Sequence, residues 1–225
     1  GDPACTPVIP ALFRQLIEEA ARAARTSEFV DQSSGVSARL TIAAIEALHA
    51  NVLQRGLLLG EKAPVARLVD LAATLAAMTG KIELAYEGEQ EGPLKVGWHV
   101  LGESIKRLWA EKFPAVIHDG GDERDAGPWK PVLRWFAAGN KLVLGDRTPT
   151  GEHEASLAAV PGLADLAEKY AKPAPAERAL WQEFLIEGFF HGGVIARVES
   201  GRGLVYSDLL AHMMAGGDGK KRKRP

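Results

Sequence analysis

The chain has 225 residues, of which 46% are hydrophobic and 25% are charged, and its formal net charge is −2. This length and composition are typical of a globular protein with a sizeable core, and the nearly balanced charge by itself favours neither a nucleic-acid nor a membrane partner. The single cysteine, Cys5, excludes an internal disulfide framework and fits a reducing compartment, so we expect a cytoplasmic protein.

The charge is unevenly distributed along the chain. Five of the 27 basic residues lie in the terminal sequence GKKRKRP, so the remaining 22 basic residues face 29 acidic residues and the rest of the chain has a net charge of −7. We expect residues 213–225 to form a disordered, solvated basic tail, and an acidic body of this kind argues against nucleic acid as the partner.

The sequence begins GDPACTPVIP, with neither an initiator methionine nor the pattern of a signal peptide. We therefore expect a fragment or a processed piece of a longer protein. No apolar run approaches the roughly 18–20 residues that a membrane span needs, which predicts that a membrane is not a partner.

Four segments of the first half carry apolar residues at helical spacing. The first runs from about Pro10 to Arg25, and the second runs from Ser37 to about Arg55, where Gly56 is expected to end it. The third covers Pro64–Met78, with Pro64 near its first turn, and the fourth covers Pro93–Phe113.

Two further segments of this half carry weaker signals. GKIELAYEGEQEG (80–92) alternates apolar and polar residues only briefly, so both a helix and an extended chain remain open. HDGGDERDAGP (118–128) is charged and rich in turn-forming residues, which is typical of a surface linker.

The second half predicts shorter elements. PWKPVLRWFAAGN favours a short helix, KLVLGD a short strand, and RTPTGEHEAS a loop. Two helices are expected at about Ala159–Ala171 and Ala176–His191, and RVESGRGLVYSD favours two short strands around the turn Ser200-Gly201-Arg202-Gly203. The sequence therefore predicts a mainly α fold, with a helical domain over 1–113, a linker over 114–128, and a smaller helical module with a short β-hairpin over 129–212.

The sequence carries little of the chemistry that an independent enzyme needs. The phosphate-binding pattern G-x-x-x-x-G-K-[ST] is missing, because neither Gly80-Lys81 nor Gly219-Lys220 is followed by a hydroxyl residue. His153-Glu154 begins like the zinc motif H-E-x-x-H, but position 157 is leucine. The six histidines show no ligand spacing, and Asp119, Asp122 and Asp125 lack the pattern of a calcium loop, so we expect no metal site and no catalysis by this chain alone.

One arginine stands at an unusual place. If Ser37 caps the second helix, Arg39 lies in its first turn, where the helix dipole makes a cation unfavourable by roughly 0.3–1 kcal/mol. A phosphate bound there would compensate, because first-turn N–H groups and a guanidinium together form an anion site. From the residues alone, an exposed arginine that points into water remains the alternative.

The segment SEFVDQSSGVSARLTI, followed by GEKAPVARLVDL and TGKIELAYEGEQEG, resembles the C-terminal half of a magnesium-chelatase subunit I-like AAA+ ATPase, a group related to the MoxR-type ATPases. The similarity extends through EFLIEGFFHGGVIARVESGRGLVYSD, and so covers nearly the whole chain up to the basic tail. In that family the stretch matching Ser34–Leu40 is the sensor-2 motif of the helical lid.

The resemblance implies a function for Arg39 and Ser37. An arginine at the sensor-2 position reaches the terminal phosphates of ATP, bound with Mg²⁺ on a preceding α/β subdomain, so Arg39 and Ser37 are the expected nucleotide-binding residues. The same resemblance implies a homo-oligomeric ring, the upstream AAA+ α/β subdomain as a partner, a von Willebrand A-domain protein as a further partner, and either remodelling of a client or metal insertion.

Two other readings stay open. The chain could be a helical protein–protein interaction module with no nucleotide role, or it could contact nucleic acid through Arg197, Arg202 and the basic tail. The polar segment that holds Lys81, Glu83, Glu87, Glu89 and Glu91 is either solvated or a contact surface for a neighbouring subunit. The aromatic residues of the second half are expected to build a second small core: Trp129, Trp135, Phe136, Trp181, Phe184, Phe189 and Phe190.

Overall fold

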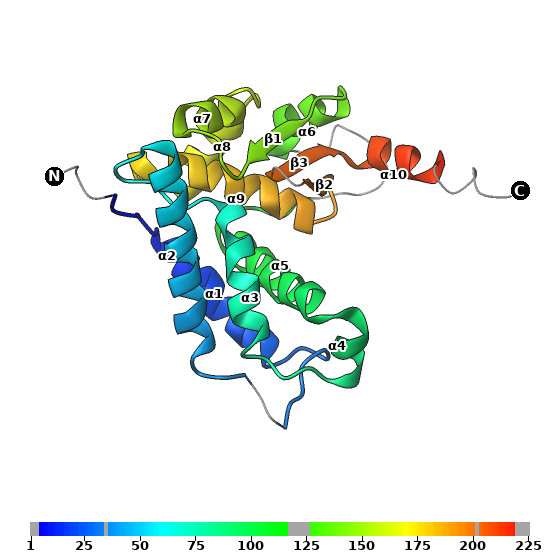
Figure 1. Ribbon diagram of the computed structural model, residues 1–225. Helices are drawn as coiled ribbons and strands as arrows, with labels where there is room; N and C mark the ends of the chain where they lie inside the picture. The colour runs from blue at the N-terminus through cyan, green and yellow to red at the C-terminus, as the bar shows by residue number, and fades with distance from the viewer. Residues whose placement is uncertain (1–4, 34–35, 117–126, 201–202, 219–225) are drawn as a thin grey trace, which may run out of the picture. The chain divides into compact units, whose positions relative to one another are not determined.

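The computed structural model describes residues 5–33, 36–116, 127–200 and 203–218 (Figure 1). The chain forms two compact units, Gly1–Glu111 and Lys112–Pro225. The described residues are mainly helical with one small antiparallel sheet, which confirms the predicted fold class. Most of the expected surface linker, and the aspartates Asp119, Asp122 and Asp125, lie outside the described residues.

The described part of the first unit consists of helices with a few isolated β-bridges. Its elements are α1 (Ala11–Ala24), α2 (Leu40–Leu59), the 3₁₀ helix η1 (Leu68–Ala73), α3 (Thr74–Thr79), α4 (Tyr86–Glu91) and α5 (Pro93–Lys112). The long helix α2 packs against α1, η1 and α3 (Figure 1). Apolar residues of α1 at helical spacing are fully buried, as their periodicity predicts: Leu12, Phe13, Leu16, Ile17, Ala20 and Ala24.

The prediction that Gly56 ends α2 is wrong. The helix continues to Leu59 and is closed by Gly60, whose φ of 69° is the left-handed conformation that favours glycine at this place. Gly56 is instead a packing position, because a Cβ atom there would lie 2.5 Å from Cγ of Pro64. The absence of a side chain lets the following loop return close to the helix.

The prediction that Pro64 opens the third helix is also wrong. Val65 forms an isolated parallel β-bridge with Val8, so this part of the chain is extended. The helical segment begins only at Leu68, as η1, where the Oδ2 atom of Asp70 accepts a hydrogen bond from the backbone N–H of Arg67 at 2.8 Å. The helix ends at Thr79, immediately before Gly80, as expected.

The segment 80–92, which the sequence left open, is first extended and then helical. Ile82 forms an antiparallel bridge with Val36, and Leu84 forms one with Val30, before α4 begins at Tyr86. Gly88 is required here, because a Cβ atom at this position would lie 2.1 Å from the carbonyl oxygen of Phe29.

The second unit combines short helices with the sheet. Its elements are η3 (Gly127–Trp129), α6 (Lys130–Ala137), β1 (Leu142–Gly145), α7 (Thr150–Ala158), α8 (Leu163–Ala171), η4 (Pro175–Glu177), α9 (Arg178–His191), β2 (Ile195–Ser200), β3 (Gly203–Asp208) and α10 (Leu209–Asp218). The strand order is β1-β3-β2, with antiparallel pairs throughout. The predicted hairpin is therefore present as β2 and β3, and β1 pairs with the other edge of β3.

Two predictions for this unit are wrong. The segment 147–156, expected as a loop, contains most of α7, which begins after Pro149, places Glu152 in its first turn and buries His153 and Leu157. The chain from 213 onward was expected to be disordered, but α10 continues to Asp218, and its start is capped by Asp208, whose Oδ2 atom accepts the N–H of Ala211 at 2.8 Å. Residues 219–225 lie outside the described part of the chain.

The expected aromatic core is present. The ring of Trp129 lies 5.5 Å from the rings of both Tyr170 and Phe189, centroid to centroid, and Phe184 and Phe136 are fully buried. Trp135, Trp181 and Phe190 lie partly exposed at the edge of this core. No helix in the described part of the chain has both the length and the apolar character that crossing a bilayer requires.

Candidate functional site

Ser37 and Arg39 lie together at the start of α2. Arg39 occupies the N-cap position, with φ −82° and ψ −5°, so the helix starts two residues later than a Ser37 cap would place it. Ser37 nevertheless shapes this end: its Oγ atom accepts the N–H of Arg39 at 3.2 Å, and its carbonyl oxygen accepts the N–H of Leu40 at 2.9 Å. The backbone of the predicted motif is thus fixed by Ser37.

The side chain of Arg39 is exposed, and it forms no ion pair with any residue that the structure describes. The N–H groups of Thr41 and Ile42, in the first turn of α2, likewise have no hydrogen-bond acceptor within the described residues. A free guanidinium beside free helix N–H groups is a suitable arrangement for the terminal phosphate of a nucleotide.

The start of α2 is held by hydrogen bonds to residues 81–83. The N–H of Ser37 donates to the carbonyl oxygen of Lys81 at 3.1 Å, and the N–H of Asp31 donates to that of Glu83 at 2.9 Å. Together with the Val36–Ile82 bridge, these bonds join two motifs that are far apart in the sequence. No pattern in the sequence predicts this pairing, because two bridging residues are too few to produce a strand pattern.

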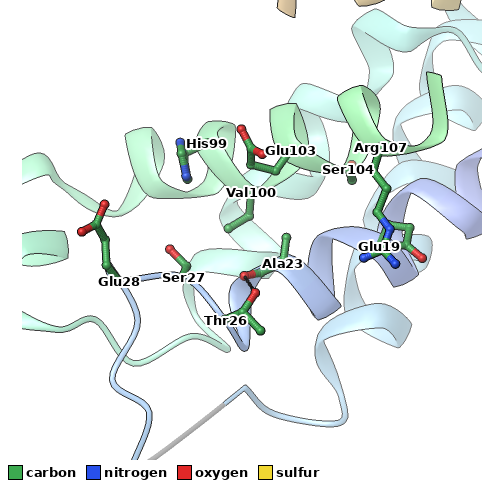
Figure 2. Close-up of a pocket in the computed structure, with 10 residues that line it drawn as sticks. All are labelled: Glu19, Ala23, Thr26, Ser27, Glu28, His99, Val100, Glu103, Ser104 and Arg107. Atoms are coloured by element: carbon green, nitrogen blue, oxygen red, sulfur yellow. Dashed lines mark hydrogen bonds and ion pairs between the residues drawn. The ribbon is translucent and has the colours of Figure 1, made fainter. Parts of the chain in front are cut away.

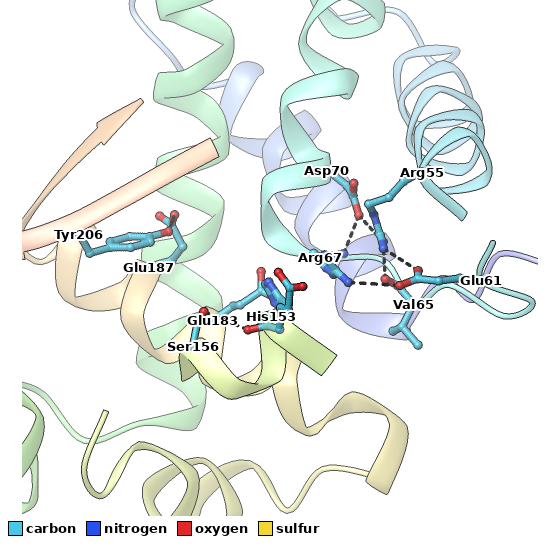
Figure 3. A network of polar contacts seen from close by, with 11 residues as sticks. Arg55, Glu61, Val65, Arg67, Asp70, His153, Ser156, Glu183, Glu187 and Tyr206 are labelled. Carbon is cyan, nitrogen blue, oxygen red and sulfur yellow. Dashed lines mark hydrogen bonds and ion pairs between the residues drawn. The ribbon is translucent and has the colours of Figure 1, made fainter. Parts of the chain in front are cut away.

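The other end of α2 contains a buried ionic cluster that the sequence analysis missed. Arg55 is 3% exposed, and its Nη2 atom lies 3.1 Å from Oδ2 of Asp70 and 2.6 Å from the carbonyl oxygen of Val65 (Figure 3). Its Nη1 atom lies 3.3 Å from Glu61, which Arg67 approaches at 3.8 Å. The cluster ties the loop after α2 to the start of η1.

The second unit has its own buried charged cluster, on α9 and the sheet. Arg197 binds both carboxylate oxygens of Glu187, at 2.8 and 2.9 Å. The hydroxyl of Tyr206 donates to the same carboxylate (Figure 3). Arg197 also lies over the ring of Phe190, 4.2 Å from its centroid. The sequence suggested Arg197 as a candidate contact for nucleic-acid phosphate, but its guanidinium is bound to Glu187 within the fold.

The environment of Glu187 shifts three pKa values. Burial alone would raise the pKa of Glu187, but the hydrogen bond from His191, the charge of Arg197 and the hydroxyl of Tyr206 outweigh it and lower this pKa. Burial and the neighbouring carboxylate raise the pKa of Tyr206 well above its ordinary value. Burial would lower the pKa of Arg197, but Glu187 outweighs it and raises that pKa. The cluster therefore holds a fixed ion pair and a neutral phenol, which is a structural arrangement rather than an acid–base pair.

His153 and Glu183 form a second buried pair in this unit. Both side chains are 2% exposed, and Nε2 of His153 lies 2.7 Å from Oε1 of Glu183. The pair joins α7 to α9 inside the unit. The described residues contain no group of three or more His, Cys, Asp or Glu side chains that could hold a metal ion.

An open pocket of about 580 Å³ lies in the first unit, between the end of α1 and α5 (Figure 2). Among the lining residues, Glu19 pairs with Arg107 at 3.4 Å, and it also pairs with Arg22, outside the lining, at 2.9 Å. The ring of His99 meets that of Phe29 edge to face at 5.2 Å.

No protein-family model, no curated protein and no solved structure matches this chain.

Proposed function

We propose that this chain is the helical lid and C-terminal region of an AAA+ ATPase of the magnesium-chelatase subunit I-like type. Arg39 serves as its sensor-2 arginine and contacts the terminal phosphates of ATP held on a preceding α/β subdomain. The lid passes the nucleotide state to neighbouring subunits of a ring in the cytoplasm. The intact protein remodels a partner, such as a von Willebrand A-domain protein, or assists metal insertion.

One observation carries the proposal: an exposed arginine, without an ion-pair partner among the described residues, occupies the N-cap position of a 20-residue helix. An arginine at this end is electrostatically unfavourable unless an anion compensates it. The position also matches the motif arginine of the resembled family. A guanidinium already bound to a carboxylate, as Arg55 is, would argue against this role.

The surrounding backbone suits the role. The Ser37 hydrogen bonds and the pairing with Lys81 and Ile82 fix the direction in which α2 starts, so the guanidinium reaches outward from a rigid base. A group that is positioned before the phosphate arrives loses less entropy on binding it. Bound Mg²⁺ would neutralise the charge that develops on the phosphates, with ligands from outside this chain.

The proposal is tested in the full-length protein encoded by the gene. Arg39→Ala removes a charge-assisted contact worth about 1.5–3 kcal/mol, so we expect ATP turnover at subsaturating ATP to fall roughly tenfold or more. Arg39→Lys keeps the charge and loses the planar fork, so it should recover only part of the activity.

A matched control is Arg14→Ala, because Arg14 is an exposed arginine on α1 and lies outside the motif. This variant should keep the turnover and nucleotide affinity of the unmodified protein. Unchanged turnover and affinity in Arg39→Ala would remove Arg39 from the mechanism and leave the interaction module without a nucleotide role.

A further inference from the structure

The small sheet of the second unit carries an apolar row on the face that points away from its core. Side chains along a strand alternate between the two faces of a sheet. On one face they are buried: Leu142, Leu144, Leu204 and Tyr206. On the other face, Val205 pairs with Val143 of β1 and with Val198 of β2, so three valines cross the sheet in register. Val143 is 55% exposed and Val198 is 42% exposed, so the described part of the chain leaves both ends of this valine row in contact with solvent.

Strand β1 is an edge strand whose outer side has no partner among the described residues. In the order β1-β3-β2 it pairs with β3 alone (Figure 1). No other described residue forms a hydrogen bond with the backbone of Leu142–Gly145. In an antiparallel edge strand, alternate residues turn their N–H and C=O groups away from the sheet. β1 can therefore pair with one more strand, as in peptide recognition by strand addition.

The two edges of the sheet differ in how open they are. Proteins commonly protect an edge strand with charged side chains, proline or a bulge. β2 carries Arg197 and Glu199, and the side chain of Glu199 is 51% exposed. β1 has the sequence Leu-Val-Leu-Gly, with no charged residue or proline, and its pairing with β3 is continuous. The open edge is therefore β1.

The residues beside β1 supply positive charge. Lys141 directly precedes the strand and Arg147 follows it by two residues, and both are exposed. Neither forms an ion pair with a described residue. Asp146 is the one carboxylate between them in the sequence. A segment laid along β1 meets a cation near each end, which favours a segment with carboxylates at its own ends.

We propose that β1 binds an extended acidic segment of a different protein, which adds to the sheet as a fourth strand. Its backbone pairs with the open edge, and an apolar β-branched residue beside Val143 extends the valine row. Its terminal carboxylates lie near Lys141 and Arg147. The described acidic stretch of this chain, residues 83–91, is occupied by the bridge at Leu84 and by α4, so a different protein supplies the segment.

Nucleic acid fits this edge less well. It would use the two cations but leave the backbone groups of β1 and the valine row without partners. The chain outside its terminal basic sequence also has a net charge of −7, which repels phosphate. The inference does not rest on nucleotide binding, so Arg39→Ala should bind the acidic segment like the unmodified chain.

The test measures binding of a fluorescent peptide to the full chain by anisotropy. The probe is Glu-Glu-Val-Thr-Val-Thr-Glu-Glu, which has a β-branched centre and acidic ends, and it should bind saturably. The matched peptide with lysine in place of each glutamate should bind at least about tenfold more weakly, because it places like charges beside Lys141 and Arg147.

Two methylated forms of the acidic peptide test the backbone pairing. Each carries N-methyl groups on alternate amides of the centre, so one form blocks the amides that face β1 and the other blocks those that face solvent. The first form should bind about tenfold more weakly, because it loses hydrogen bonds to the edge. The second form should stay within about threefold of the unmethylated peptide, because its blocked amides have no partner in the complex.

Variants of the chain test the position of the site. Val143→Glu should weaken binding of the acidic peptide at least about tenfold, whereas Val198→Glu, at the other end of the valine row and two strands from the open edge, should not. Circular dichroism confirms that each variant is folded.

A pair of double variants separates local from overall charge. Lys141→Glu with Arg147→Glu should also weaken binding about tenfold. Arg14→Glu with Arg25→Glu changes the net charge equally at exposed positions of the first unit and should have little effect.

Four results would overturn the proposal. The acidic peptide could fail to bind the unmodified chain, or both methylated forms could bind as well as the unmethylated one, which would leave charge attraction alone. Val198→Glu could weaken binding while Val143→Glu does not. Finally, a short single-stranded oligonucleotide could bind more tightly than the peptide and lose this binding in the Lys141→Glu/Arg147→Glu variant, which would assign the two cations to nucleic acid.

Discussion

The two ends of α2 place an arginine in opposite environments, one exposed and one buried. At the start of the helix, Arg39 is exposed and has no ion-pair partner among the described residues. Near its end, Arg55 is buried and bound to Asp70, Glu61 and the carbonyl oxygen of Val65. One cation is thus occupied by the fold, while the other is available to a ligand.

The contrast separates a charge that stabilises the fold from a charge that is available to a ligand. Removing a partner from a buried ion pair leaves an uncompensated charge, so such residues should report on stability. Removing an exposed, unpaired arginine should change stability little, so any effect it has should concern a ligand.

The largest expected effect is that of Arg55→Ala. It leaves Asp70 and Glu61 without their central cation, and we expect the free energy of unfolding to fall by about 3–5 kcal/mol. Arg39→Ala should stay within about 0.5 kcal/mol of the unmodified chain. Urea denaturation of both variants measures the free energy of unfolding. Equal losses in the two variants would contradict the predicted difference between Arg55 and Arg39.

The buried ion pair between Glu187 and Arg197 should, like Arg55, contribute to the stability of the fold. Glu187→Gln keeps the shape of the side chain but removes its charge beside Arg197 and Tyr206, which should cost about 1.5–3 kcal/mol at neutral pH.

The pH dependence follows from the same group. Because the pKa of Glu187 is lower in the folded protein than its ordinary 4.5, its contribution is present above pH 4.5 and is lost as the pH falls through the folded value. Unfolding followed by fluorescence between pH 7 and 3 should show a shallower acid loss in Glu187→Gln. An identical pH profile in both proteins would contradict this role.

A smaller effect is expected at Gly88. This glycine lies close to the backbone of Phe29, next to the bridge between Val30 and Leu84. An alanine there must displace the carbonyl of Phe29, so Gly88→Ala should destabilise the protein by about 1–3 kcal/mol. Gly151→Ala is the control, because Gly151 lies in α7 with open space around it. Thermal unfolding should separate the two, and similar melting temperatures would show that this close approach is relaxed in solution.

The smallest effect is expected at Ser37. Ser37→Ala removes the acceptor for the N–H of Arg39 at an exposed site, which should cost about 0.5–1 kcal/mol. Ser156→Ala, on the exposed face of α7, should cost nothing, since alanine is the better helix former. If Ser37 also contacts phosphate, the nucleotide affinity of Ser37→Ala would fall by more than this loss of stability explains. Such a result would assign a direct ligand contact to Ser37 as well as to Arg39.

The sequence by itself determined the long, strongly amphipathic elements. The apolar spacing in α1 and α5 places their boundaries within a residue or two of the observed ones, because every turn of such a helix repeats the same signal. The β2–β3 hairpin was also evident, since its signal lies within one short stretch. The position of Arg39 at a helix start followed from the same local pattern.

Tertiary contacts decided the rest. Gly56 lies inside α2 because Pro64 packs against it, and residues 82–85 are extended because Val30 and Val36 pair with Leu84 and Ile82. Arg55 and Glu187 are buried because partners distant in sequence compensate their charge. A local pattern cannot contain such information, because the free energy of a glycine, a short extended segment or a charged side chain depends on neighbours that only folding brings within reach.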